Sequence, residues 1–277
     1  MPERIIHFIF GLRPQDEPFH LLHYLAIESC RRVLAPDEIR LHLFHLPYGV
    51  YWDLARPLVQ LHRVEPIAEV DAVEVDPMVA RYRHAHHSDV IRLDVLARDG
   101  GMYADIDTLF VRPVPEHWWD VEALIGREAP VQYSDRSDPE PSVSNALMMA
   151  RPGSDFITTW RDQIVETMDG TWSEHSCRLA TRLAEANPES VLVVDKERFS
   201  PFDHTPEGVS ALLEEPMIPG ALDRTYSVHL CAHLWWEQDR TDFSRFSAAA
   251  VTEDLLRETD TPLATLARPF LPDHGLF

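Results

Sequence analysis

Hydrophobic and polar residues in the first part of the chain alternate between strand-like and helix-like patterns. An apolar run over 4–11 and an alternating segment over 38–46 have the length and pattern of β-strands. Between them, residues 19–35 carry apolar side chains at three- and four-residue spacing and stop before Pro36, which predicts a helix. A further helix and a short third strand follow over 50–67. Strands that alternate with helices in this way predict an α/β fold with a mostly parallel central sheet flanked by helices.

A helix that ends in two glycines comes next, within 88–111, "SDVIRLDVLARDGGMYADIDTLFV". Ser88 is a good N-cap residue, and four apolar residues behind it form a buried stripe: Val90, Leu93, Leu96 and Ala97. Gly100 suits the left-handed residue that closes a helix, and Gly101 permits close approach of another backbone. We therefore expect a helix that starts at Ser88 and stops at Gly100.

Two aspartates follow, in "MYADIDTLFV" (102–111), which begins as a strand and carries Asp105 and Asp107 at its edge. Aspartate is a poor strand residue, so two of them beside an apolar stretch are costly unless something there favours negative charge. Side chains two apart on an extended backbone point to the same side. Oxygen ligands on one side suit a hard divalent cation that keeps positions open for phosphate oxygens. An isolated pair of this kind is a weak signal in an acidic chain.

The second half of the chain is less regular. We expect helices over 155–168, 177–186 and 254–267, the last interrupted by Pro262, a buried strand over 190–194, and a strand that runs into an aromatic loop over 226–236.

Composition narrows the possible partners. The 277 residues, 45% of them apolar, fit one α/β unit or a core with a small appendage. The net charge of −21 repels nucleic acid and anionic membranes, and no run of Lys or Arg opposes it. The same charge repels a nucleotide sugar, so a bound diphosphate would need a cation to mediate. General solubility explains many of the surface carboxylates equally well.

Three widely spaced cysteines indicate neither a disulfide framework nor a zinc site. The apolar run "IIHFIF" near the N-terminus is too short for a signal sequence, and no apolar window approaches the length of a membrane span. We therefore expect a reducing, cytoplasmic location.

A series of residues around the aspartate pair resembles the signature of the DXD-containing sugar-binding glycosyltransferases. That group includes the yeast-type initiating mannosyltransferases, the α-1,4-glycosyltransferases and, more distantly, the glucosylating clostridial toxins. The matching positions are Ser88, Asp89, Arg92, Leu96, Gly100, Gly101, Tyr103, Asp105, Ile106 and Asp107. Less sharply, "RIIHFIF", "VSNALMMARPGSDF" (143–156) and "VHLCAHLW" (228–235) are similar to the opening, downstream and closing blocks of the family.

The resemblance implies a GT-A nucleotide-diphospho-sugar transferase fold in one domain over 1–277. Residues 1–112 would form the nucleotide-sugar-binding half, and 113–277 the acceptor-side half with a C-terminal helix. The implied activity is that of a retaining, hexosyltransferase-type glycosyltransferase that depends on Mn²⁺ or Mg²⁺. Its partners would be a UDP- or GDP-linked sugar and the hydroxyl of a glycan or small-molecule acceptor.

The resemblance also assigns roles residue by residue at the metal and the sugar. Asp107 would be the principal metal ligand, and Asp105 would share the metal shell and face the ribose. His229 would be the third ligand, although a histidine satisfied within a strand is an equal alternative. Asp89 and Arg92 would hold hydroxyls of the donor sugar.

Other matched residues would complete the site. Asn145 would contact the sugar or the acceptor, unless it caps a turn. Phe10 stands where the family has tryptophan and could stack on the base, and Gly101 and Tyr103 lie beside the donor in the motif, although Tyr103 is more simply a core residue. Trp235 belongs to the closing block, where Leu234 replaces a small polar residue. We expect metal and nucleotide to order the segment 231–240.

Two further clusters have open interpretations. His84, His86 and His87 precede Ser88, and without a second ligand pair they indicate a solvated or donor-loop role more than zinc. In each adjacent tryptophan pair, 118–119 and 235–236, at most one ring can face the core. The other could stack on a sugar, although packing explains both.

Two other functions compete with sugar transfer. A haloacid-dehalogenase-like phosphatase would use Asp105 as nucleophile and Asp107 as general acid, but its motif normally lies near the N-terminus with a glycine after the pair. A non-catalytic sugar-nucleotide-binding protein could share the fold, because fold alone does not determine function. The intact aspartate pair favours the enzyme.

Overall fold

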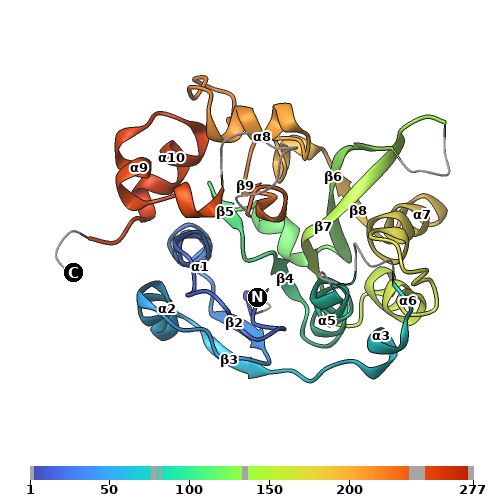
Figure 1. Cartoon of the computed structure of the whole chain (residues 1–277). Coiled ribbons are helices and arrows are strands. Elements are labelled where there is room, and N and C mark those ends of the chain that lie inside the picture. The colour runs from blue at the N-terminus through green and yellow to red at the C-terminus, as the bar shows by residue number, and fades with distance from the viewer. Residues whose placement is uncertain (1–2, 76–79, 81–82, 133–136, 237–246, 274–277) are drawn as a thin grey trace.

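A seven-stranded sheet, in the order β3-β2-β1-β4-β7-β6-β8, forms the centre of the protein (Figure 1). The computed structural model describes residues 3–75, 80, 83–132, 137–236 and 247–273. β1 is parallel to β2 and β4, β2 to β3, and β6 to β8, whereas β7 is antiparallel to both β4 and β6. The predicted α/β fold with a mostly parallel sheet is therefore confirmed. The strands are β1 (Ile5–Ile9), β2 (Glu38–Leu43), β3 (Gln60–Arg63), β4 (Gly101–Ala104), β6 (Ala123–Val131), β7 (Glu140–Ala150) and β8 (Leu192–Val194), with β5 (Thr108–Phe110) and β9 (Ser227–His229) in a separate antiparallel pair.

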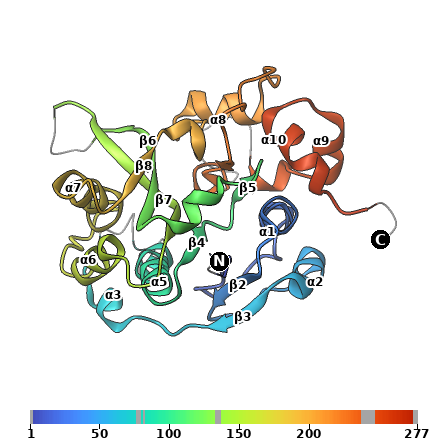
Figure 2. The same ribbon diagram turned by 180° about the vertical axis from the view of Figure 1, so that it is seen from behind.

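Helices cover both faces of the sheet (Figures 1 and 2). The α-helices are α1 (Leu21–Leu34), α2 (Val50–Ala55), α3 (Ala68–Ala72), α5 (Arg83–Asp99), α6 (Asp155–Ile164), α7 (Leu179–Ala186), α8 (Pro206–Leu213), α9 (Glu253–Glu258) and α10 (Pro262–Ala267). The short helices are η1 (Arg56–Leu58), η2 (Glu116–Asp120), η3 (Glu174–Arg178), η4 (Lys196–Arg198), η5 (Ala232–Leu234), η6 (Ala248–Ala250) and η7 (Arg268–Phe270).

The side chains of β4 show how the two layers divide. Met102 and Ala104 belong to a core shared with α1, α2, α8, α9 and α10, whereas Tyr103 belongs to a core shared with α5, α6 and α7. This alternation follows from the two-residue period of a strand. Because β4 is buried on both faces, the turn that follows it starts from a rigid position.

Helix α5 starts earlier than the sequence predicted. It begins at Arg83, so Ser88 lies inside the helix and is not its N-cap. The Ser88 hydroxyl instead lies 3.4 Å from the Tyr103 hydroxyl and accepts a hydrogen bond from Arg92 at 3.1 Å. His86 and His87 are buried, so the histidine-rich residues before Ser88 extend the packed face of the helix.

The two glycines after α5 have the conformations that the sequence predicted. Gly100 adopts φ +67°, and its N–H bonds to the Leu96 carbonyl, closing the helix. Gly101 has φ +92°, and a Cβ there would lie 2.4 Å from the Ile5 carbonyl oxygen. The backbone that approaches Gly101 closely is therefore that of β1, the strand that pairs with β4.

The two aspartates do not lie on an extended strand. β4 ends at Ala104 and β5 begins at Thr108, so Asp105 and Asp107 occupy the turn between them. The Thr108 N–H bonds to the Asp105 carbonyl at 3.0 Å and closes this turn. The expectation of an extended backbone is therefore wrong at this point.

In the second half, the predicted helices are found as α6, α7 and the pair α9 and α10, which Pro262 separates. The long antiparallel strands β6 and β7 were missed. Residues 237–240 of the segment 231–240 lie outside the described residues. Within the part of the chain that the structure describes, no helix has both the length and the apolar character needed to cross a membrane.

Candidate functional site

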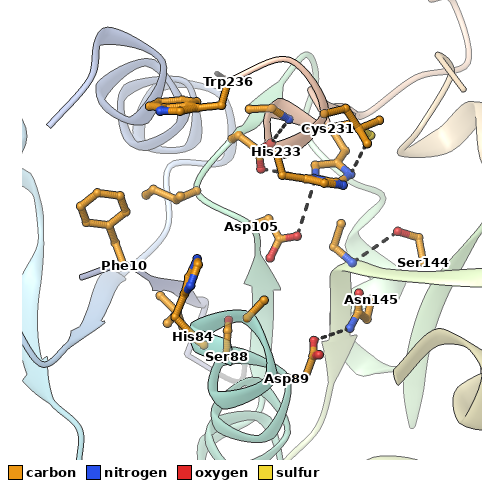
Figure 3. Close-up of a pocket in the computed structure, with 18 of the residues that line it drawn as sticks. Phe10, His84, Ser88, Asp89, Asp105, Ser144, Asn145, Cys231, His233 and Trp236 are labelled. Carbon is orange, nitrogen blue, oxygen red and sulfur yellow. Dashed lines mark hydrogen bonds and ion pairs between the residues drawn. The ribbon is translucent and has the colours of Figure 1, made fainter. Parts of the chain in front are cut away.

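A cavity of about 790 Å³ opens at the end of β4 (Figure 3). One wall comes from α5 and the β4–β5 turn, and carries Asp89, Arg92, Asp105 and Asp107. The facing wall comes from β7, the segment 172–177, and β9 with the loop that follows it. Residues from both halves of the chain therefore line one cavity.

Three candidate metal ligands converge at its centre. His229 Nε2 lies 3.3 Å from Asp107 Oδ1 and 3.7 Å from Asp105 Oδ2. One ligand atom from each of the three side chains lies within 4.8 Å of the others. Antiparallel pairing of β5 with β9 sets Thr108 opposite His229, which explains how residues so far apart in sequence meet.

The charges of these buried side chains influence one another. Burial alone would raise the pKa of Asp107, but His229 and the Ala232 N–H, which donates to Asp107 Oδ2 at 2.7 Å, hold this pKa well below its usual range. Burial alone would lower the pKa of His229, but interactions with Cys231 and Asp107 raise it well above its ordinary value. A protonated His229 thus balances Asp107, and a divalent cation would replace that proton.

The donor set fits a divalent cation of the Mn²⁺ or Mg²⁺ kind. Two carboxylates and one imidazole supply oxygen and nitrogen ligands to one side of such an ion, and the cavity lies on the other side. Phosphate oxygens could complete the shell from there.

Asp89 is held by hydrogen bonds from both halves of the chain. Its Oδ1 accepts from Asn145 Nδ2 at 2.8 Å and lies 3.2 Å from Arg92 Nη2 (Figure 3). Its Oδ2 lies 3.2 Å from His175 Nε2. Burial alone would raise the pKa of Asp89, but Arg92 and His175 lower it below the ordinary value. The carboxylate therefore stays ionised inside the wall of the cavity.

Arg92 connects this carboxylate to the aspartate pair. Its Nη1 donates to the Asn145 carbonyl at 2.8 Å and lies 3.4 Å from Asp105 Oδ1. Its guanidinium lies 4.5 Å from the centroid of the Tyr103 ring, whose hydroxyl donates to Asp105 at 2.5 Å. Burial raises the pKa of Asp105 despite the nearby arginine. Tyr103 is 1% exposed, so its main contacts are with Arg92 and the core.

The aromatic residues predicted for the donor lie in different places. Phe10 lines the cavity and packs on His23, with ring centroids 4.7 Å apart. Trp235 is fully buried and donates to the Leu230 carbonyl, whereas its neighbour Trp236 lines the cavity and stacks on His23 at 5.1 Å (Figure 3). The adjacent tryptophans thus divide as the sequence suggested, but the ring that lines the cavity is that of Trp236.

Gly101 also lies away from the cavity lining, packed on β1. A donor contact through Gly101 or Trp235 therefore has no support from their positions. The other matched residues, Asp89, Arg92, Asp105, Asp107, Asn145 and His229, lie together around one cavity. Their individual roles stay predictions.

Two residues at the site have no signal in the sequence. His175 comes from a π-helical turn, Glu174–Arg178, outside every motif that carries the resemblance. Glu128 lines the cavity from β6, accepts from the Ser142 hydroxyl at 2.6 Å, and has a pKa raised by burial. Among the three histidines that precede Ser88, His84 lines the cavity, whereas the His87 ring bonds to Asp71 at 3.0 Å.

Comparisons with known proteins agree with this geometry. Residues 61–126 match the model of the family described as "Glycosyltransferase sugar-binding region containing DXD motif". "Glucan organizing enzyme 1" of Cryptococcus neoformans var. grubii serotype A is 28% identical over 276 residues, which span 96% of this chain and 70% of that protein. A crystal structure of the galactosyltransferase LgtC, in complex with donor and acceptor sugar analogs, superposes with a TM-score of 0.50 at 14% identity over 97% of each chain.

The matched region begins in β3 and ends in β6, so it contains α5 and the aspartate turn. The structural likeness shows the GT-A fold. The predicted resemblance is thus confirmed: residues 61–126 match the DXD-containing sugar-binding region of glycosyltransferases, and these similarities together indicate a glycosyltransferase enzyme.

Proposed function

We propose that this glycosyltransferase moves a hexose from a UDP- or GDP-linked sugar to an acceptor hydroxyl, with Mn²⁺ or Mg²⁺ held by Asp105, Asp107 and His229. The convergence of these three side chains beside Asp89 and Arg92 in one cavity carries the proposal. Retention of the anomeric configuration is proposed from the family resemblance. The acceptor would be a glycan or a small molecule.

In this proposal the bond between the anomeric carbon and the diphosphate oxygen breaks, and a bond to the acceptor oxygen forms. A bound divalent cation would neutralise charge on the departing diphosphate. Asp89 and Arg92, fixed on α5, would accept from and donate to hydroxyls of the donor sugar. Asn145 would hold Asp89 in place from β7, and Trp236 and Phe10 would flank the base.

We also propose that the two halves of the chain bind different substrates. Residues 1–112 would bind the nucleotide sugar and 113–277 would bind the acceptor, as parts of one unit. Asn145 and His229 are exceptions, because they belong to the second half but contact Asp89 and Asp107 of the first. The cytoplasmic location is likewise a proposal, supported by three cysteines that are all free.

The competing functions explain the site less well. A phosphatase would use the aspartate pair but gives no reason for Asp89 and Arg92 beside it, or for His229 against Asp107. A non-catalytic binding protein explains the cavity but gives no reason for a sugar-facing ion pair next to the metal ligands.

A screen of UDP- and GDP-sugars tests the proposed function. We expect release of sugar from at least one donor when Mn²⁺ or Mg²⁺ is present and loss of that release with EDTA. An Asp105→Asn, Asp107→Asn double variant serves as the matched control for contaminating activity. Turnover that is unaffected by EDTA or by the double substitution would contradict metal dependence. Lack of turnover and of nucleotide binding across the panel would contradict the proposed donor class.

A further inference from the structure

Protein groups contact both oxygens of the Asp89 carboxylate. A carboxylate offers about four acceptor positions, two on each oxygen. On Oδ1, Asn145 Nδ2 donates a hydrogen bond at 2.8 Å, and Arg92 Nη2 forms an ion pair at 3.2 Å. On Oδ2, His175 Nε2 at 3.2 Å occupies one. Acceptor capacity is left on Oδ2, in a side chain that lines the cavity and is 9% exposed.

His175 is itself fixed by its surroundings. Its side chain is fully buried, and its carbonyl accepts from Trp160 Nε1 at 3.0 Å. It lies in a π-helical turn whose next residue, Ser176, has the non-helical angles φ −103° and ψ −107°. Such turns are uncommon and often occur at functional sites. Here the kinked backbone brings a histidine from the second half onto Asp89 of α5.

The tautomer of His175 follows from its partner. An ionised carboxylate only accepts, so Nε2 carries the proton. Nδ1 is buried without a hydrogen-bond partner, and it belongs to a ring that packs edge-on against His86, with centroids 4.6 Å apart. The pKa of His86 is lowered to about 4, mainly by burial, so His86 adds no positive charge near pH 7. His175 thus acts on Asp89 as a directed donor.

We propose that His175 is a positioning residue that, together with Asn145 and Arg92, fixes Asp89 so that its carboxylate accepts one hydroxyl of the donor sugar, through Oδ2. This inference rests on the proposed function, in which Asp89 meets the donor sugar. It makes His175 a determinant of donor specificity without direct contact with the substrate. No motif shared with the family includes this residue.

Two substitutions of His175 separate positioning from packing. In His175→Leu the ring is replaced by an apolar side chain, and Oδ2 loses its fixed donor. In His175→Gln an amide N–H can take the place of Nε2–H. We expect His175→Leu to lower kcat/KM for the donor about 10- to 100-fold, the range for one hydrogen bond to a charged group, while the Kd of the free nucleoside diphosphate with Mn²⁺ changes less than about threefold. His175→Gln should recover most of that loss.

His87→Leu is the matched control. It removes another buried histidine, which lies on α5 and bonds to an aspartate outside the cavity lining, Asp71. It should lower thermal stability about as much as His175→Leu while leaving donor kcat/KM near that of the parent. Equal loss of nucleoside-diphosphate and nucleotide-sugar affinity in His175→Leu, or an equal kinetic loss in His87→Leu, would overturn the inference.

Single-deoxy donors test the claim of one hydroxyl. In the parent enzyme, one deoxy analogue should lose about 10- to 100-fold in kcat/KM through Asp89. In His175→Leu that same analogue should lose much less, because the two changes remove one interaction and are not additive. Additive losses for every deoxy analogue would overturn the inference.

A measurement without substrate distinguishes failure of this inference from failure of the proposed function. Imidazole ¹⁵N spectra of the histidine-labelled protein, with the His175 signal assigned by its absence in His175→Gln, should show a proton on Nε2 and a bare Nδ1. A proton on Nδ1 alone would overturn the inference. If the tautomer is as expected but no nucleotide sugar is turned over, the proposed function is wrong, whereas the hydrogen bond by which His175 positions Asp89 is still supported.

Discussion

The two walls of the cavity differ in what they contribute. The wall from α5 and the β4–β5 turn carries the charged groups Asp89, Arg92, Asp105 and Asp107. The facing wall supplies their partners. Asn145 and His175 hydrogen-bond to Asp89, and His229 forms an ion pair with Asp107. The first wall is compact in sequence, whereas the second is scattered over the second half. Charge is therefore concentrated in one segment, and its orientation is set by another.

The largest expected effect comes from removing a charge of the first wall. Asp107→Ala should lower sugar transfer by about three decades or more, because groups that stabilise charge in the transition state contribute on this scale. Nucleotide binding should also lose its dependence on Mn²⁺. Titration calorimetry with UDP and GDP, with and without Mn²⁺, checks the second point. Asp120→Ala, on the exposed side of η2, is the control and should behave like the parent protein.

The adjacent tryptophans of the second wall should give opposite results. Trp235→Ala leaves a cavity in the core and should lower the free energy of unfolding by about 3–5 kcal/mol. Trp236→Ala removes a ring that lines the donor cavity, so it should weaken nucleotide binding by about tenfold and barely change stability. Urea unfolding and nucleotide titration, applied to both variants, provide the comparison. Two variants with the same profile would show that the rings do not divide in this way.

Substitution of His229 tests whether the second wall contributes a metal ligand in addition to the groups that hold Asp89. His229→Ala should raise the Mn²⁺ concentration for half-maximal activity by about tenfold or more, because loss of even an outer partner of a metal ligand costs this much. Activity at saturating Mn²⁺ should partly recover, since Asp105 and Asp107 remain. An unchanged Mn²⁺ response would assign His229 to the strand pairing alone.

The smallest effect concerns the strands beneath the first wall. His7 Nε2 bonds to the Gly100 carbonyl at 2.9 Å and His7 Nδ1 to His42 Nε2 at 3.0 Å. Burial lowers the pKa of His7 to about 4 and that of His42 to about 3. The unfolded chain, with histidine pKa near 6.5, therefore binds more protons below that pH, and the unfolding free energy falls as pH drops from about 6.5 toward 4.

Each such histidine contributes at most about 1.4 kcal/mol per pH unit to this slope. His7→Asn should lower stability at pH 7 but flatten the slope between pH 6 and 4.5 by up to that amount. Urea unfolding at several pH values measures it. An unchanged slope would mean that His7 does not titrate on unfolding.

The first wall could be predicted from sequence because its residues are close together. Local periodicity predicts α5, glycines mark its end, and the aspartates follow at once. The turn around Asp105 and Asp107 was not predicted, because an apolar run on both sides of the pair also fits one strand. The predicted start of α5 is too late, because Ser88 is a good cap residue. The helix already begins at Arg83, and the side chains of His86 and His87 are buried in its first turns.

Much of the second wall could not be predicted from periodicity. β6 and β7 contain polar and proline residues, such as Pro130 and Pro141, which obscure the alternation of a strand. His175 depends on a kinked π-helical turn, and no local pattern predicts which residue such a turn directs inward. Asn145 and His229 were found because the family resemblance covers them. The family resemblance points to Trp235, the tryptophan of the closing block, and the sequence does not show which of two adjacent rings is buried.

Pairing of β5 with β9 has an evolutionary consequence. Thr108 lies opposite His229, and the Leu230 N–H bonds to the Asp107 carbonyl, so the backbone itself sets the spacing of the three candidate ligands. Connections in the stretch between the two strands, outside β6, β7 and the turn that carries His175, can therefore change in length and sequence without moving those ligands. Insertion, deletion or drift in these connections would leave the arrangement of the three candidate ligands unchanged.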